Sequence, residues 1–133
     1  MTWGGVNYLA VLVAGLAGYG FGAIFYTSLS AAWLDAIGKK KEELSPSKVP
    51  FVVAAVANLV MAWMLAGLMS HLGAPTIRSG VISAGFCWLG FVITTMAVNN
   101  AFGGRRPKLT VIDGIHWLGV LVIQGAIIGA FGA

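Results

Sequence analysis

Residues 49–77, VPFVVAAVANLVMAWMLAGLMSHLGAPTI, contain no Lys, Arg, Asp or Glu. A helix needs about 20 apolar residues to cross a hydrocarbon core about 30 Å thick, and this stretch is long enough. Three further stretches also lack all four charged residue types: residues 2–34, 79–104 and 114–133. The charged residues stand between these stretches. The pattern predicts a polytopic membrane protein with four transmembrane helices.

The composition leads to the same class of protein. The 133 residues are 59% hydrophobic and 9% charged, whereas a soluble domain carries about 25% charged residues. Four spans leave almost no chain for a soluble domain. We therefore predict one all-α domain over residues 1–133, a compact bundle of four transmembrane helices. The expected spans are about residues 6–30, 50–72, 79–102 and 111–132.

The basic residues predict the orientation of the chain. Seven of the eight Lys and Arg residues fall in the first and third connections, at 39–41, 48, 105, 106 and 108, and the second connection holds only Arg78. Lys and Arg concentrate in cytoplasmic loops, so we expect both basic loops in the cytoplasm and both termini outside. Basic residues beside helices meet anionic headgroups. The net charge of +4 therefore indicates membrane lipids as partners, and not nucleic acid.

Two local patterns concern the helix ends. Leu29, Trp33 and Ile37 continue at helical spacing after the first span, which fits a short interfacial helix with its apolar stripe against the bilayer. An extension of the first span would explain the same pattern. Thr110 and Asp113 have the spacing of a capping box, which predicts the start of the fourth span at Thr110.

Small residues at four-residue spacing predict close helix packing, because association inside a bilayer depends on close contact and hydrogen bonds. The clearest pairs are Gly18 with Gly22 in the first span and Gly125 with Gly129 in the fourth. The fourth span carries small residues on two adjacent faces, which leaves one for another protein chain. We therefore expect a homo-oligomer, or association with another membrane subunit.

Polar residues near the basic end of the spans form an inner layer. Its members lie within about 10 Å of the helix ends at a rise of about 1.5 Å per residue: Tyr26, Asn99, Asn100, Asp113 and His116. A functional interpretation is a polar vestibule that admits water, an ion or a headgroup. The structural alternative is helix capping plus a hydrogen bond between Asp113 and His116, which share one helix face.

Deeper polar residues need partners because water is absent there. The same depth estimate places Asn58 level with Thr94 or Thr95, which predicts an interhelical hydrogen bond between Asn58 and a threonine. Gln124 falls in an outer layer near Ser83 and Cys87, where it would bond within the chain or bridge two chains.

The sequence contains little that indicates chemistry. Only Asp113 and His116 have ligand spacing on one helix, and two ligands do not define a zinc or iron site. We therefore expect no metal, no cofactor and no catalytic residue, and a protein that is not an enzyme.

The main hypothesis is a membrane protein acting as a homo-oligomer or as a subunit of a larger assembly. One alternative is a channel or transporter for a small solute, through the inner polar vestibule or between protomers. Another is a lipid-modifying enzyme that uses Asp113 and His116 as a dyad.

Several segments together resemble a known family. They are Val6-Asn7-Tyr8, the segment from Gly22 to Ser28, Trp33, Asn99-Asn100, and the segment from Ile112 to Trp117. The chain resembles, over nearly its whole length, a bacterial family of small four-helix membrane proteins catalogued as domain of unknown function 1761. The resemblance implies four spans in a bacterial inner membrane. It implies no substrate and no catalytic residue.

Overall fold

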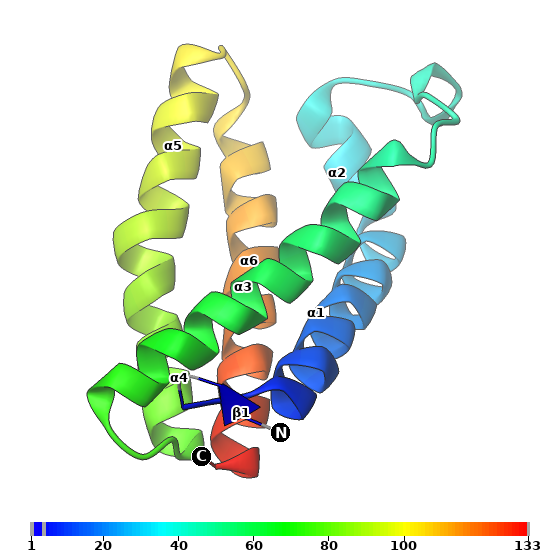
Figure 1. The fold of residues 1–133 in the computed structure, drawn as a ribbon. Coiled ribbons are helices and arrows are strands. Elements are labelled where there is room, and N and C mark those ends of the chain that lie inside the picture. The colour runs from blue at the N-terminus through cyan, green and yellow to red at the C-terminus, as the bar shows by residue number, and fades with distance from the viewer. Residues whose placement is uncertain (1, 4, 133) are drawn as a thin grey trace.

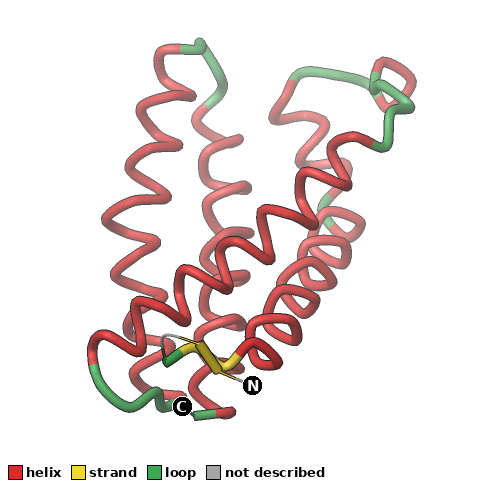
Figure 2. The backbone as a smooth tube through the Cα atoms, viewed as in Figure 1, coloured by secondary structure: helices red, strands yellow, loops and turns green. Residues whose placement is uncertain are grey.

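The protein is an all-α bundle, as predicted. The computed structural model describes residues 2–3 and 5–132. Four long apolar helical segments can each cross a membrane: α1 (Tyr8–Ser28), α3 (Val49–Leu72), the continuous segment Ile77–Phe102, and α6 (Pro107–Phe131). These four segments are those of a multi-pass membrane protein. Figure 1 shows α6 in the middle, with α1 and α5 on opposite sides and α3 crossing diagonally. The two basic connections lie at one end of the bundle, and β1 and the end of α6 lie at the other (Figure 2).

A small hairpin precedes the first helix and was not expected from the sequence. Strands β1 (Thr2–Trp3) and β2 (Val6–Asn7) pair antiparallel. Gly5 between them has a φ of 79°, a backbone conformation that glycine adopts without steric cost. The side chain of Asn7 caps α1 by accepting hydrogen bonds from the backbone N–H of Leu9 and Ala10, at 3.1 and 3.2 Å.

The chain after the first span forms a separate helix, α2 (Ser30–Ile37), followed by the short 3-10 helix η1 (Lys41–Glu43). The apolar side of α2 does not match the expected stripe against the bilayer. Its Ala36 is buried in a cluster with Leu109 and Ile112 of α6, and Trp33 and Ile37 pack on the same cluster. The start of α6 therefore covers much of the face that the sequence assigned to lipid.

Ion pairs at the surface join the end of α2 to the start of α6. The ammonium of Lys108 donates to Asp35 Oδ2 at 2.8 Å, and the Arg106 guanidinium donates to the Asp35 backbone carbonyl. The hydrogen bond from Lys108 lowers the pKa of the Asp35 carboxyl below its ordinary value. These contacts hold α2 against α6 outside the membrane-spanning part of the chain.

The third span contains an irregular turn. It consists of α4 (Ile77–Cys87), the π-helical segment η2 (Trp88–Val92) and α5 (Ile93–Phe102). The N–H of Ile93 bonds to the carbonyl of Trp88, five residues back. The Trp88 indole N–H donates to the Gly114 carbonyl of α6 at 2.8 Å. The π turn therefore lies where a hydrogen bond joins the third span to the fourth. Single π turns inside α-helices are frequently found at functional sites.

The fourth helix begins earlier than predicted. Helix α6 starts at Pro107, with Arg106 as its N-cap and no side-chain cap. The expected capping box of Thr110 and Asp113 is therefore wrong, because both residues already lie inside the helix. Proline at the first helical position loses no hydrogen bond and has a suitable φ, which explains the earlier start.

Glycines let α4 and α6 touch backbone to backbone. A Cβ atom added at Gly80 would overlap the Gly125 carbonyl, and one added at Gly129 would overlap the Thr76 carbonyl. Gly125 and Gly129 are both buried. This small-residue face of α6 is thus occupied by α4 of the same chain, and it does not provide the free face that an oligomer would use.

Candidate functional site

The inner layer contains a polar cluster formed by Tyr26, Asp113 and His116. Tyr26 lies in the last turn of α1, and the other two lie one turn apart on α6. The Tyr26 hydroxyl donates to Asp113 Oδ1 at 2.5 Å. The Tyr26 ring centroid is 4.7 Å from that of His116. The structure therefore brings together three of the five residues that the sequence assigned to this layer.

Aromatic side chains enclose His116, which is only 5% exposed. Phe21 stacks on its ring with a centroid distance of 6.2 Å, and Phe25 and Trp117 lie at 5.6 and 4.5 Å. Gly22 closes another side, because a Cβ there would lie 2.8 Å from His116 Nε2. Within the described chain, His116 Nδ1 is buried without a hydrogen-bond partner. The cluster is a packed junction of α1 and α6, and His116 does not line an open vestibule.

The hydrogen bonds within the cluster contain neither the Asp113–His116 bond of the structural alternative nor the dyad of the enzyme alternative. Asp113 bonds to Tyr26 across the helix interface, and the described residues show no hydrogen bond between Asp113 and His116. An acid–base dyad needs the carboxylate to orient the imidazole. The arrangement therefore supports a tie between α1 and α6, and it does not support the lipid-modifying chemistry considered for this pair.

The two asparagines of the inner layer separate from the cluster and from each other. Asn100 Nδ2 donates to Thr110 Oγ1 at 3.0 Å and so ties α5 to α6. Asn99 faces outward and lines an open hollow of about 340 Å³ with Thr94, Thr95 and Val98. Asn99, Thr94 and Thr95 are all exposed, and we call these three residues the α5 polar face.

A second buried polar pair joins α3 and α6 in the core. Gln124 is fully buried and Asn58 is 3% exposed. Gln124 Nε2 lies 3.1 Å from the backbone carbonyl of Asn58 and 3.4 Å from its Oδ1, while Asn58 Nδ2 donates to the Ala54 carbonyl at 2.8 Å. Gly18 of α1 packs directly on both amides. The pair therefore lies where α1, α3 and α6 meet.

This pairing corrects one prediction and decides another. Asn58 does not bond to a threonine. Gln124 bonds within the chain, which is one of the two alternatives predicted for it, and its partner is Asn58. The Thr94 and Thr95 hydroxyls donate to carbonyls of their own segment, at 2.9 and 2.6 Å. Helix α3 is strongly inclined to α6 (Figure 1), so equal residue counts along the two helices do not give equal depths.

One contributor to the packing was not found from the sequence. Trp88 bonds to the backbone of α6, and this contact could not be predicted because any residue can supply a backbone carbonyl. Among the residues that the structure describes, no group of three or more His, Cys, Asp or Glu side chains gathers as metal ligands would.

Comparison with known sequences identifies the family. The sequence profile described as "Protein of unknown function (DUF1761)" matches residues 9–129. The chain belongs to this family. No curated protein and no solved structure matches the chain. The matched range covers both buried polar clusters and the α5 polar face, so these features lie within the part shared with DUF1761.

Proposed function

We propose that this DUF1761 protein is a non-enzymatic membrane protein that assembles with a second copy of itself through α5. The observation that carries the proposal is the α5 polar face, which points away from the rest of the bundle. Among the described helices, α5 packs mainly on α6, and its opposite side is uncovered. In a single copy, this side would face lipid tails.

The chemistry of this face favours another helix over lipid. Asn99 lies in the last turn of α5, close to headgroup level, and the described residues give its side chain no hydrogen bond. Thr94 and Thr95 lie deeper on the same face, where water is absent. Polar side chains that bond across helices contribute about 0.6 to 2 kcal/mol each in membranes. Gly90, Ala97 and Ala101 are also exposed on this segment, and small residues let helix backbones approach closely. A facing copy of α5 would give each Asn99 amide a partner of matching chemistry.

Cysteine cross-linking in native membranes tests the proposal. In a Cys87→Ala background, Thr95→Cys should give a disulfide-linked dimer on oxidation. Val53→Cys on the exposed side of α3 is the matched control and should remain monomeric. A cross-link at Val53 alone, or none at Thr95 with a monomeric mass in mild detergent, would refute self-assembly through α5. A cross-link from Thr95→Cys to a different protein would show a mixed assembly instead.

A second candidate function uses the same surface. A pathway between two protomers, lined by Thr94, Thr95 and Asn99, would carry a small polar solute, and the open hollow at these residues favours it. Passage would require Asn99, whereas close contact through the small residues Gly90, Ala97 and Ala101 would keep two copies together without it. In liposomes, Asn99→Ala should abolish solute flux while the Thr95→Cys cross-link persists. Equal flux with and without the substitution would remove this candidate.

A further inference from the structure

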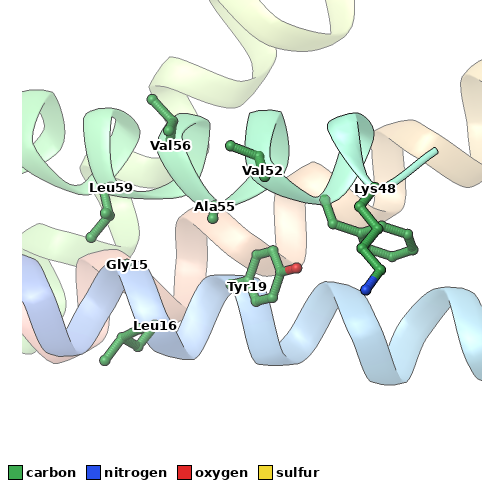
Figure 3. A pocket seen from close by; sticks show the side chains of 9 residues that line it. Gly15, Leu16, Tyr19, Lys48, Val52, Ala55, Val56 and Leu59 are labelled. Atoms are coloured by element: carbon green, nitrogen blue, oxygen red, sulfur yellow. The ribbon is translucent and has the colours of Figure 1, made fainter.

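A groove open to the surrounding lipid lies between α1 and α3 (Figure 3). Its volume is about 670 Å³, which is within the range of about 300–1,000 Å³ found for ligand sites. The lining is almost entirely apolar, and Leu16, Val52, Ala55 and Leu59 are among its residues. Lys48 provides the charged group, and Tyr19 provides a hydroxyl.

The groove runs along α3 within one bilayer leaflet. Its deep end closes where Gly15 meets Leu59, because a Cβ at Gly15 would lie 2.6 Å from Leu59 Cδ2. Its other end lies at Lys48, the residue that precedes α3. The eleven steps from Lys48 to Leu59 span about 16 Å along the axis of α3 at the helical rise. Because α3 is inclined to the other spans (Figure 1), the groove descends by less than this length. It therefore reaches from the headgroup level into one leaflet of a hydrocarbon core about 30 Å thick.

The charged end of the groove is free to bind an anion. Among the described residues, both ion pairs involve Asp35, and no carboxylate pairs with the Lys48 ammonium. Figure 3 shows the Lys48 nitrogen directed across the groove toward α1. The Tyr19 oxygen points toward the same end from a deeper position. A cation therefore lies at headgroup level, with a hydroxyl donor below it and apolar walls deeper still.

We propose that this groove binds one anionic phospholipid. The Lys48 ammonium pairs with the phosphate, and the Tyr19 hydroxyl donates to an ester oxygen beneath it. One acyl chain lies along Ala55 and Leu16 as far as Leu59. This order of groups matches the order along a phospholipid from headgroup to tail. A zwitterionic lipid fits the walls equally well, but its own cation already neutralises the phosphate, so Lys48 favours the anionic lipid.

Native mass spectrometry of the detergent-purified full chain tests the charged end. Phosphatidylglycerol should bind more tightly than phosphatidylcholine with the same acyl chains. Lys48→Gln should weaken phosphatidylglycerol binding by about fivefold, the effect of about one basic residue at a membrane surface, and leave phosphatidylcholine unchanged. Lys41→Gln makes the same change of charge outside the groove and should have no effect. Equal binding of the two lipids, or equal effects of the two substitutions, would overturn the proposal.

Filling the groove tests the acyl-chain part independently. Ala55→Phe should reduce the retention of both lipids, whereas Val53→Phe, on an exposed position outside the groove, should not. Soluble glycerol phosphate should fail to compete, because it lacks the chain that the walls contact. Undiminished lipid retention by the folded Ala55→Phe protein would show that lipid binds elsewhere. Effective competition by glycerol phosphate would show a simple phosphate site.

Discussion

Replacement of Gly18 by alanine should destabilise the bundle far more than the same change two residues away. A Cβ at Gly18 would lie 2.5 Å from Asn58 Oδ1, 2.7 Å from Gln124 Nε2 and 3.1 Å from Val120 Cγ1. Ordinary van der Waals contact begins at about 3.4 Å, so both amides must move by several tenths of an ångström. Asn58 and Gln124 are buried and have little room to move.

Two contributions determine how much Gly18→Ala lowers the free energy of unfolding. Overpacking a tight core costs about 1–3 kcal/mol. Displacing Gln124 also weakens its hydrogen bond to Asn58, worth about 0.6–1.7 kcal/mol in a membrane protein. We therefore expect Gly18→Ala to lower the free energy of unfolding by about 2–4 kcal/mol. Gly20 has no atom within 4 Å of an added Cβ, so Gly20→Ala should be neutral or stabilise by up to about 1 kcal/mol through helix propensity.

Reversible unfolding in mixed detergent and SDS micelles measures both variants. A double-mutant cycle identifies the cause: Asn58→Ala removes the oxygen that the new methyl group meets. Gly18→Ala should therefore cost less in the Asn58→Ala background, with a coupling of at least about 0.5 kcal/mol. Equal stability of the Gly18→Ala and Gly20→Ala proteins, or strictly additive effects in the cycle, would refute the reasoning.

Three further predictions address other contacts. Gly80→Ala should lower the unfolding free energy by more than Gly85→Ala in the same micelle assay, because an added Cβ meets backbone at Gly80 and nothing within 4 Å at Gly85. Tyr26→Phe should cost about 1.5–3 kcal/mol in that assay, since it leaves the Asp113 carboxylate without its donor; an unchanged unfolding curve would contradict this. The ion pairs of Asp35 should persist from neutral pH downward and break only as the pH falls through its lowered pKa, because the native state favours the charged carboxylate. A carboxyl-carbon NMR titration measures that pKa, and an ordinary value would contradict the contact.

The four spans could be predicted because they depend only on the lengths of charge-free sequence and on bilayer thickness. The grouping of Tyr26, Asp113 and His116 could be predicted for a related reason. These residues lie within a few turns of the basic connections, so errors in depth stay small there. Asn58 and Gln124 lie deeper, where the inclination of α3 to α6 makes residue counting unreliable.

Rotation about a helix axis was the other feature that the sequence did not reveal. Asn99 and Asn100 are neighbours, yet one faces outward and the other bonds to α6. Which asparagine faces α6 depends on the π turn at η2, which shifts the regular helical spacing before α5. The hydrophobic pattern of the sequence does not predict such a turn. The contact of α2 with α6 could not be predicted either, because an apolar stripe on a helix does not show whether it packs on lipid or on another helix.

The π turn also limits how the third span can change in length. A π turn holds one more residue than a regular turn, and one residue corresponds to about 100° of rotation in an α-helix. Deleting Gly90 would let the segment close into a regular helix, with its hydrophobicity almost unchanged. Because the removed residue is the extra one of the π turn, α5 would keep its rotation about the helix axis, and Asn100 would keep its contact with Thr110. A deletion in the regular helix α4 would instead rotate everything after it by about 100°. The segment would then remain a good transmembrane helix but would present the wrong side to α6, so its length is limited by angular register and not by membrane thickness alone.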